Sequence, residues 1–283
     1  MSRWRPFPHD SEHFSYPGSE LEAAWAELHA GDCAAFPDES WVSECLERWP
    51  EAAPPGFSGN LVDLADNLQQ CWRDFHAGAF GAAIEAAEQL GTLAHASANK
   101  AAGIYSTYLE TDKTQQQKCL VDASERAEAA RAIMPEDPNA HYLLAFTLGR
   151  YSQSISISKA LRQGIGGRII DALKRTLELA PDHAEAHTAS GMYHAEIINK
   201  VGKMIGGITY GASAEKALEH FARALELTPE SPIAHIEYGN GLYLLYGDRR
   251  IDEVTDLFVK ASELYPRDAM ERLDVETALA ELE

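Results

Sequence analysis

The apolar positions along the chain show almost none of the two-residue alternation that predicts β-strands. The one clear alternation, Ser-Ile-Ser-Ile-Ser at residues 154–158, is short and lies between helical patterns, so we expect it to continue or interrupt a helix. Alanine, which has the highest helix propensity, is abundant throughout, as in the segment 82–87. The pattern therefore predicts an all-α protein built from closely packed helices.

Three segments repeat the same arrangement of proline and histidine. In each, a helical pattern ends at a proline and a new one begins six residues later with Ala-His. The pairs are Pro135 and His141, Pro181 and His187, and Pro229 and His235, with a weaker copy ending at Pro266. Proline stops the first helix because it lacks an N–H and clashes with the preceding turn. These copies predict consecutive helix pairs joined by similar turns.

Small and aromatic residues recur at fixed distances from these prolines and histidines. They are Ala217, Phe221 and Ala224 before Pro229, Ala123, Ala127 and Ala130 before Pro135, and Ala145, Gly191 and Gly239 after the histidines. At these residues the chain resembles the tetratricopeptide repeat (TPR) family, in which a small residue lets the two helices of a pair, A and B, approach closely. Because one pair cannot bury its own apolar face, pairs stack on their neighbours. The resemblance implies a right-handed superhelical solenoid of about four to five TPR-like helix pairs plus a C-terminal helix.

The spacing between the prolines is uneven. It is 46 residues from Pro135 to Pro181, 48 from Pro181 to Pro229, and 37 from Pro229 to Pro266. A standard TPR takes about 34 residues, so each of the two middle repeats carries an insertion of roughly 12–14 residues between helices A and B. These extended middle repeats resemble the TPR region of the regulator of microtubule dynamics family and its bacterial relatives, over residues 60–283. The resemblance implies a non-enzymatic protein whose TPR region takes part in protein tethering and, in some members, in lipid contact.

The first 58 residues differ in composition from the rest. They hold four of the five tryptophans, Trp4, Trp25, Trp41 and Trp49, together with many of the prolines. Aromatic residues at this density are rare in disordered tails, and the ends of a solenoid need capping. We therefore expect a Trp/Pro-rich helical cap at residues 1–58 and the solenoid at residues 59–283. The residues after Met1 contain no apolar stretch of the kind found in signal peptides.

The chain is acidic, with 44 acidic residues against 24 Lys and Arg and a formal net charge of −20. This charge argues against general nucleic-acid binding and favours a soluble protein that resists self-association. No apolar run approaches the roughly 18 residues of a membrane-spanning helix. The four cysteines, Cys33, Cys45, Cys71 and Cys119, fit neither a zinc site nor a disulfide framework, and we expect free thiols in a cytoplasmic protein.

Three histidines, His183, His187 and His194, come closest to a metal-binding motif, because a His-x-x-x-His pair on a helix can chelate a metal ion. The alternative is structural: His187 and His194 occupy positions that pack helix A on helix B, and His183 lies in the turn after Pro181. No glycine-rich stretch has the spacing of a nucleotide-binding loop, and no Gly-x-Ser-x-Gly elbow is present. The sequence predicts no metal, no cofactor and no enzymatic activity.

TPR solenoids commonly bind ligands in the concave groove lined by helix A. Aligning the repeated histidines predicts the groove positions Tyr142, Phe146, Arg150, Thr188, Met192, Glu196, Ile236, Asn240 and Tyr243. These positions lack the Lys and Asn clamp with which chaperone-binding TPR proteins hold a terminal carboxylate. The mostly apolar, aromatic groove suits an amphipathic helix or an acyl chain.

The two insertions are locally basic. Residues 151–168 and 197–211 contain no acid, and the basic residues at the insertions are Lys159, Arg162, Arg168, Lys200 and Lys203. If the insertions pack side by side, these cations form an anion-binding patch for a phospholipid headgroup, an acidic peptide or a polyanion. The alternative is that they form ion pairs with acidic helices of the same molecule.

These features predict a non-enzymatic cytoplasmic scaffold that binds a protein or peptide through the groove and the basic insertions. A lipid-binding or membrane-contact module is the alternative, with the groove holding acyl chains and the insertions holding anionic headgroups. The second function predicts binding that weakens steeply with salt.

Overall fold

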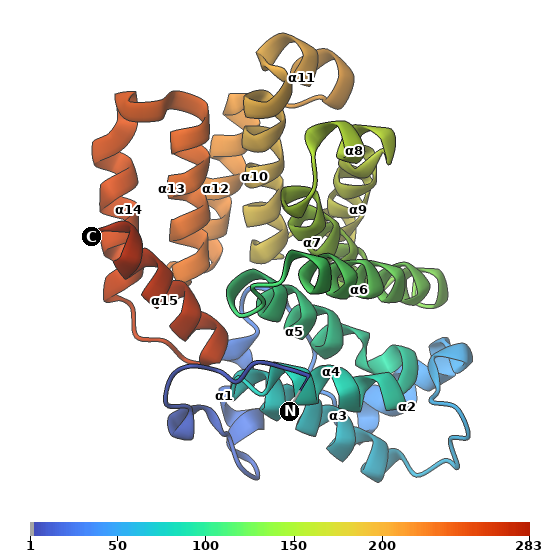
Figure 1. Ribbon diagram of the computed structural model, residues 1–283. Helices are drawn as coiled ribbons and strands as arrows, with labels where there is room; N and C mark the ends of the chain where they lie inside the picture. Colours follow the sequence, from blue (N-terminus) through green and yellow to red (C-terminus); the bar gives the residue numbers. More distant parts are fainter. Residues whose placement is uncertain (1–2) are drawn as a thin grey trace. The chain divides into compact units, whose positions relative to one another are not determined.

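The structure is a computed structural model that describes residues 3–283. Met1 and Ser2, part of the predicted cap, lie outside the described residues. The described residues form helices and loops only, as the sequence predicts (Figure 1). The α-helices are α1 (Glu20–Leu28), α2 (Glu39–Arg48), α3 (Leu61–His76), α4 (Phe80–Gln89), α5 (His95–Tyr108), α6 (Lys113–Ile133), α7 (Pro138–Ser154), α8 (Ile157–Arg162), α9 (Ile165–Leu179), α10 (Ala184–Val201), α11 (Lys203–Tyr210), α12 (Ala214–Leu227), α13 (Pro232–Tyr246), α14 (Ile251–Glu263) and α15 (Ala269–Glu281). The 3-10 helices are η1 (Glu12–Phe14), η2 (Pro50–Ala52), η3 (Gly91–Ala94) and η4 (Gly247–Arg250).

The chain divides into two compact units. Of the described residues, the first unit comprises residues 3–29 and Ala34–Ile155, and the second comprises Ala30–Cys33 and Ser156–Glu283. Consecutive helices pack on one another within each unit, which confirms the all-α repeat architecture. The boundary predicted at residues 58 and 59, between a cap and a solenoid, stays a prediction.

In the first unit, α3 packs on α4, α4 on α5, α5 on α6 and α6 on α7. Carboxylate or amide side chains begin several of these helices: Asn60, Asp112 and Asp137 accept hydrogen bonds from backbone N–H groups in the first turns of α3, α6 and α7. The tryptophan-rich segment lies against α3, where the buried Trp25 ring meets Trp72 edge to face at 5.7 Å. In the first unit, Trp25 therefore packs α1 against α3, the first helix of the first helix pair.

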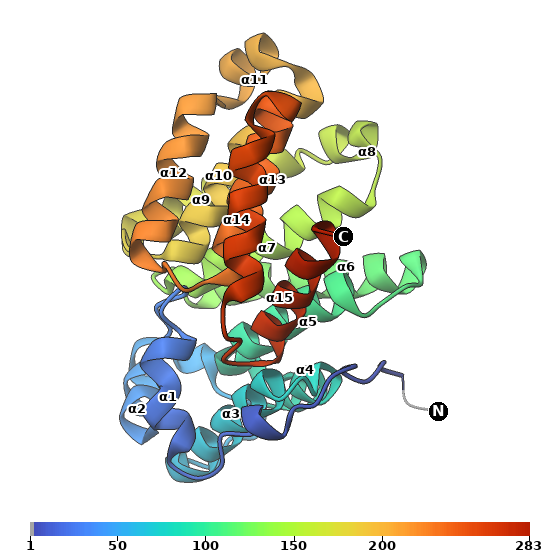
Figure 2. The same ribbon diagram turned by 90° about the vertical axis from the view of Figure 1, so that its left-hand side faces the viewer.

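In the second unit, a row of neighbouring helices runs from α10 through α12 and α13 to α14 (Figures 1 and 2). Glycines sit where the helices of a pair meet. A Cβ on Gly191 of α10 would lie 2.6 Å from the Phe221 ring of α12, and one on Gly239 of α13 would lie 2.8 Å from the Phe258 ring of α14. These distances leave no room for a side chain, so both glycines hold the small position that the repeat register predicts.

A hydrogen bond closes the turn between successive helix pairs in the same way three times. The Nε2 atoms of His141, His187 and His235 lie 2.9 Å from the backbone oxygens of Pro135, Pro181 and Pro229, respectively. Since a carbonyl oxygen only accepts, each imidazole donates through Nε2–H. The repeated Pro-to-His spacing of six residues is thus the sequence signature of a hydrogen-bonded joint between helix B and the next helix A.

The two insertions form short helices. The Ser-Ile alternation interrupts a helix, as expected, because α7 ends at Ser154 and α8 starts at Ile157, with the Ser156 hydroxyl accepting the Lys159 N–H. The second insertion forms α11, which follows Gly202 and ends at Gly211, both with positive φ. Glycine is favoured there because other residues rarely adopt this conformation.

Candidate functional site

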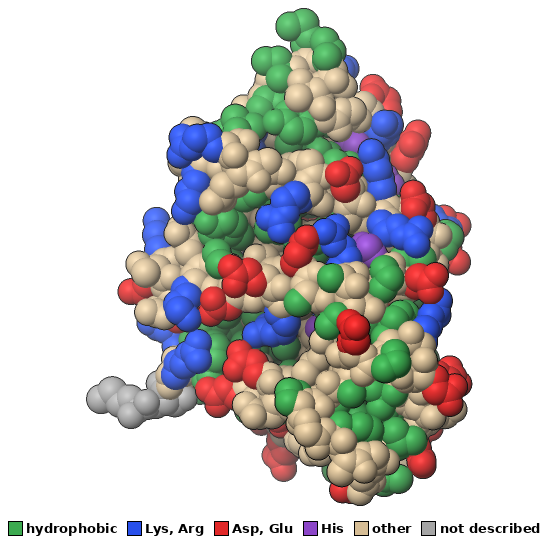
Figure 3. Space-filling model, turned by 90° about the vertical axis from the view of Figure 1, so that its right-hand side faces the viewer, with side chains coloured by type: hydrophobic (Ala, Val, Ile, Leu, Met, Phe, Trp, Pro, Cys, Tyr) green, Lys and Arg blue, Asp and Glu red, His purple; other side chains and the backbone are tan. Residues whose placement is uncertain are grey.

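The two inserted helices expose apolar side chains. On α11, Met204 is 74% exposed, Ile205 52% and Ile208 83%; on α8, Ile157 is 48% exposed and Leu161 49%. Figure 3 shows hydrophobic side chains exposed at the top of the view, at the end of the second unit where Figure 1 places α11. We call these five side chains, with the neighbouring Lys159, Arg162 and Lys203, the insertion surface.

The two insertions contact each other within the second unit. A Cβ on Gly166, in the first turn of α9, would lie 3.4 Å from the Tyr210 ring at the end of α11 and 3.7 Å from Ile197 of α10. Gly166 and Tyr210 belong to the two separate insertions, so residues 44 positions apart in the sequence meet here. This contact was not evident from the register, because a repeat pattern does not fix the direction in which an insertion leaves the array.

The five predicted anion-binding cations differ in their surroundings. The Lys200 amino group lies 2.6 Å from the Glu196 carboxylate one helical turn earlier, which is the intramolecular pairing considered above as the alternative. Lys203 lies near Glu215 and contributes to lowering the pKa of that carboxyl, after hydrogen bonds from its own backbone N–H and from Ser213. Arg162 and Arg168 are exposed and Lys159 is half-buried. Anion binding by this set stays a prediction.

In the first unit, the predicted groove residues Tyr142, Phe146 and Arg150 follow one another along α7. Tyr142 is buried, and its ring stacks on that of Phe146 at 6.0 Å. The Phe146 ring fills the space beside Gly103 of α5, and the Arg150 guanidinium lies over the ring at 5.7 Å from its centroid. Tyr142 therefore packs helices together, whereas Phe146 and Arg150 keep part of their surface open.

In the second unit, the predicted groove residues lie on α10 and α13. Thr188 and Ile236 are buried, Met192 and Glu196 are half-buried, and Asn240 and Tyr243 are exposed. The Thr188 hydroxyl donates to the Ala184 backbone oxygen, so its polar group is already satisfied. Accessible surface at these positions is thus concentrated at Asn240 and at Tyr243, which is 52% exposed.

The histidines considered as metal ligands pack between α10 and α12. His183 caps α10, with Nδ1 accepting the Ala186 N–H. His187 Nδ1 lies 2.9 Å from Nδ1 of His220, a residue that the sequence had not singled out, and the His194 ring stacks on that of His220 at 5.9 Å. Within residues 3–283, no cluster of three His, Cys, Asp or Glu side chains has the geometry to hold a metal ion.

The hydrogen bonds define which ring nitrogen carries the hydrogen in His187 and in His220. Because His187 donates through Nε2 to the Pro181 oxygen, its neutral ring presents Nδ1 as an acceptor, and His220 donates to it through Nδ1–H. Burial lowers the pKa of His194 and His220 to about 4, reinforced by the charges of neighbouring histidine and lysine residues. Burial also lowers the pKa of His187, opposed by its hydrogen bond to Pro181. The three rings are therefore neutral at pH 7.

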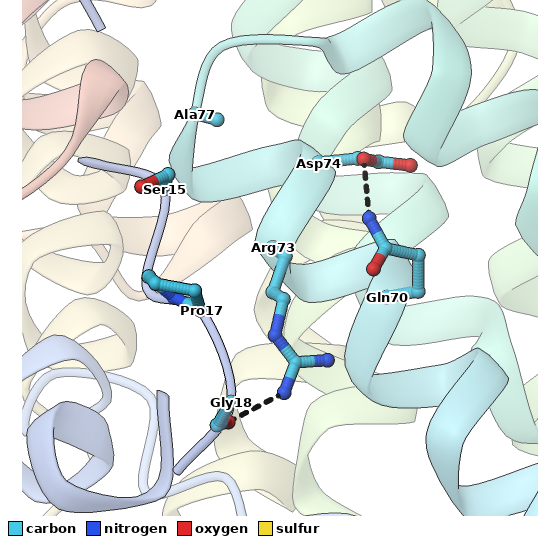
Figure 4. A pocket seen from close by; sticks show the side chains of 7 residues that line it. All are labelled: Ser15, Pro17, Gly18, Gln70, Arg73, Asp74 and Ala77. Carbon is cyan, nitrogen blue, oxygen red and sulfur yellow. Dashed lines mark hydrogen bonds between the residues drawn. The ribbon is translucent and has the colours of Figure 1, made fainter. Parts of the chain in front are cut away.

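An open pocket of about 570 Å³ lies between the loop at residues 15–18 and α3 in the first unit (Figure 4). Its lining residues are Ser15, Pro17, Gly18, Gln70, Arg73, Asp74 and Ala77. Arg73 donates to the backbone oxygens of Tyr16 and Gly18, at 3.1 and 2.9 Å, so the guanidinium holds the loop. Burial raises the pKa of Asp74, and a hydrogen bond from Gln70 opposes the rise. The side chains of Arg73, Gln70 and Asp74 thus form hydrogen bonds that hold the pocket's own lining together.

All four cysteines resist ionisation. Burial raises the pKa of Cys45 and Cys71 to about 12, and it raises the pKa of Cys33 and Cys119 as well, with the acidic neighbours Asp32, Glu185 and Asp182 adding to the effect at Cys33. We expect a thiol-reactive disulfide reagent at pH 7.4 to modify only the exposed Cys33 in the folded protein, and more slowly than it modifies a cysteine in an unstructured peptide. Stopped-flow absorbance would measure the rate. Cys33→Ser should abolish the folded-state reaction, and rapid modification of Cys71 before urea is added would contradict the burial.

Comparisons with known proteins agree with this architecture. The family model described as "Regulator of microtubule dynamics protein 1-3" matches residues 61–238, more than half of the chain. A crystal structure of a thermophilic TPR protein from Thermus thermophilus superimposes with a TM-score of 0.54 at 16% sequence identity, covering 77% of this chain and 99% of that one. At this identity the likeness shows the fold, which is TPR-like. A search of curated protein sequences found no match. No helix among the described residues has both the length and the hydropathy needed to cross a membrane.

Proposed function

Since the chain belongs to the regulator of microtubule dynamics protein 1–3 family, we propose that it is a non-enzymatic TPR scaffold that binds a protein partner through the insertion surface. A TPR-like helical repeat is suited to protein interaction in general. The observation that carries the more specific proposal is the exposure of Met204, Ile205 and Ile208 together on one short helix. Soluble proteins seldom leave neighbouring large apolar side chains in water unless a partner covers them.

The basic residues near these apolar side chains favour a partner of negative charge. The insertions contain Lys159, Arg162 and Lys203 but no acid between residues 151 and 168 or between 197 and 211, in a chain of net charge −20. Exposed apolar side chains and basic residues on the same two short helices fit an acidic, amphipathic segment of a partner. The exposed Tyr243 on α13, in the same unit, supplies a further contact for such a partner.

An anionic membrane surface is the second candidate ligand, and the same exposed side chains favour it. Met204 and Ile208 are the most exposed large apolar residues on α11, at 74% and 83%, and could enter the interfacial region of a bilayer while the lysines contact headgroups. Membrane binding would weaken steeply as salt is added, whereas binding of an amphipathic protein segment depends mainly on apolar burial.

The test is a triple variant, Met204→Ser, Ile205→Ser and Ile208→Ser. Burial of each such side chain is worth about 1.5–3 kcal/mol, so we expect at least a tenfold loss of binding, measured both by affinity capture from a cell extract of the native host and by sedimentation with vesicles containing anionic phospholipid. The matched control is Ile251→Ser, Val259→Ser and Leu279→Ser, three residues of the same unit that are 43%, 38% and 43% exposed.

The two readouts separate the candidates. Loss of captured proteins without vesicle binding by the parent supports the scaffold, and salt-sensitive vesicle binding supports the membrane module. Changing Lys159, Arg162, Arg168, Lys200 and Lys203 to Glu tests the contribution of charge in either case. Equal capture by the parent and the triple variant would remove the insertion surface from the proposal and leave the groove residues Phe146, Asn240 and Tyr243 to be tested next.

A further inference from the structure

The segment at residues 3–9 runs as an extended arm along α4 and α5 of the first unit, without secondary structure of its own. Both aromatic residues of the arm rest on glycine. A Cβ on Gly81 would lie 2.1 Å from Cγ of Trp4, and a Cβ on Gly78 would lie 2.6 Å from Cγ of Phe7. Any other residue at these two positions would exclude the rings, so α4 and the turn before it form two shallow seats for aromatic side chains.

Polar groups of α4 and of the segment around α5 surround the Trp4 seat. The indole Nε1–H donates to the Glu85 carboxylate at 2.7 Å, and the Tyr105 ring meets the indole edge to face at 4.9 Å. The Tyr105 hydroxyl oxygen also accepts the Arg5 backbone N–H at 3.2 Å and donates to Glu110 at 3.2 Å. One tyrosine therefore recognises both a side chain and the main chain of the arm.

Charge complementarity accompanies these contacts. The Arg5 guanidinium lies 3.8 Å from the Glu110 carboxylate, and the Arg3 guanidinium lies over the Trp4 ring at 4.6 Å from its centroid. The arm carries two cations and no acid before Asp10, and the surface beneath it presents the carboxylates of Glu85 and Glu110. Exposed residues separate the anchors: Arg5, Pro6 and Pro8 all lie on the surface. The arm is thus held at a few side chains, as a bound peptide is.

We infer that the surface formed by Gly78, Gly81, Glu85, Tyr105 and Glu110 is a peptide-recognition site, which the chain's own arm occupies. Its ligand class is an extended cationic peptide of the pattern Trp-Arg-Pro-aromatic, supplied by a partner protein in competition with the arm. This site is separate in residues and chemistry from the insertion surface, because its carboxylates select a basic ligand and the insertions select an acidic one. The inference does not depend on the proposed function.

Because the arm is covalently attached to the chain, it competes with a free peptide at a high effective concentration. Arg73 of α3 holds the backbone oxygens of Tyr16 and Gly18, so only residues 10–15 connect the arm to the body of the first unit. A segment on such a short connection acts at an effective concentration in the millimolar range, so the arm shields the site from a free peptide of equal intrinsic affinity. Weakening the arm without removing the site exposes it. The double variant Trp4→Ala, Phe7→Ala does this, since it deletes both aromatic anchors and leaves every residue of the site in place.

The experiment measures fluorescence anisotropy of a labelled synthetic peptide with the sequence of residues 3–10. We expect the double variant to bind this peptide at least tenfold more tightly than the parent chain does. Adding Gly81→Leu to the double variant fills the indole seat and should abolish binding. Gly149→Leu is the matched control, because a Cβ at that helical glycine meets nothing within 4 Å. Equal affinity for the parent and the double variant, or no effect of Gly81→Leu, would overturn the inference.

A second measurement uses the parent chain and so does not depend on the double variant's folding. Fluorotryptophan incorporation gives Trp4 a fluorine NMR signal, assigned by its loss in Trp4→Phe. Excess unlabelled peptide should move this signal toward the position of a solvent-exposed indole as the arm is displaced. A peptide with the tryptophan replaced by alanine should leave the signal unmoved. An unmoved signal with both peptides would show that the arm is a fixed part of the fold and would overturn the inference.

Discussion

Replacing Phe221 by alanine is expected to lower the free energy of unfolding by about 3–5 kcal/mol. The side chain is fully buried on α12, and its ring lies against two glycines on different helices: a Cβ on Gly191 of α10 or on Gly241 of α13 would come within 2.6 or 2.4 Å of it. It also stacks on Tyr238 at 5.0 Å. Removing the ring would open a cavity that three helices share, and helical backbones cannot collapse into it without losing their other contacts.

Urea denaturation followed by circular dichroism measures the loss. Tyr265→Ala is the control, because this aromatic side chain of the same unit is 81% exposed and its removal should change stability by less than about 0.5 kcal/mol. A cost below about 1 kcal/mol for Phe221→Ala would show that the ring does not fill the space between the three helices.

A substitution of Gly191 tests the same contact between α10 and the Phe221 ring. Gly191→Ala should cost about 1–3 kcal/mol in the parent, because its methyl group would collide with the ring, and less in a Phe221→Leu background, where the side chain is smaller. Gly167→Ala on α9, where a Cβ meets nothing within 4 Å, should cause no loss. Equal costs of Gly191→Ala in the two backgrounds would contradict the contact.

The second large effect is a loss of stability as the pH falls from about 6.5 to about 4. His194 and His220 have pKa values lowered to about 4 in the folded protein, whereas an unfolded histidine titrates near 6.5. The unfolded chain therefore binds protons in this range and the folded chain does not, so stability present above pH 6.5 is lost as the pH falls toward 4. A shift of this size corresponds to roughly 3 kcal/mol for the buried His194, and to less for His220, which is half-buried and partly screened by solvent.

The charged groups around these rings act in the same direction. Lys216 on α12 disfavours protonation of both His194 and His220, Lys174 on α9 disfavours it at His194, and His187 disfavours it at His220. Arg223 on α12 and Asp182 in the turn before α10 face His187 with opposite effects on its pKa. Among the described residues, the charged or titratable groups that act on the pKa of His194 and His220 are lysines and histidines, and all of them disfavour protonation.

Urea denaturation of the parent and of His194→Gln, His220→Gln at pH 7 and pH 4.5 checks this prediction. Carboxyl groups also titrate in this range, so the informative quantity is the difference between the two proteins in the stability lost. We expect the double variant to lose at least about 2 kcal/mol less than the parent. His13→Gln, an exposed histidine on η1, is the control. Equal losses in the parent and the double variant would mean that the cluster is accessible to protons when folded.

The sequence predicts the repeat architecture well because its determinants are local. Pro181 and His187 are six residues apart, and the close approach at Gly191 follows from counting four residues from His187. The family assignment also follows from spacing, since the insertions lengthen particular repeats. Each of these features is a number of residues between two positions, which can be counted in the sequence without a structure.

The site-level features that the sequence does not reveal depend on rotation and direction. His220 meets His187 only because α12 turns that face toward α10, and Tyr210 meets Gly166 only because both insertions bend toward each other. The same holds for the groove: the register identified Tyr142 and Ile236 as lining positions, but both are buried. Helix rotation of a fraction of a turn decides between packing and exposure, and amphipathic spacing alone does not fix it.

The imidazole joint between repeats also explains where this chain can change in length. The interval from proline to histidine is constant at six residues, while the intervals between successive prolines are 46, 48 and 37 residues. The added residues lie between helix A and helix B, at residues 155–164 and 202–213, outside the turns that run from proline to histidine. Evolution could therefore elaborate the A–B connections into separate modules, each acquiring its own surface, while the order in which the helix pairs stack is preserved.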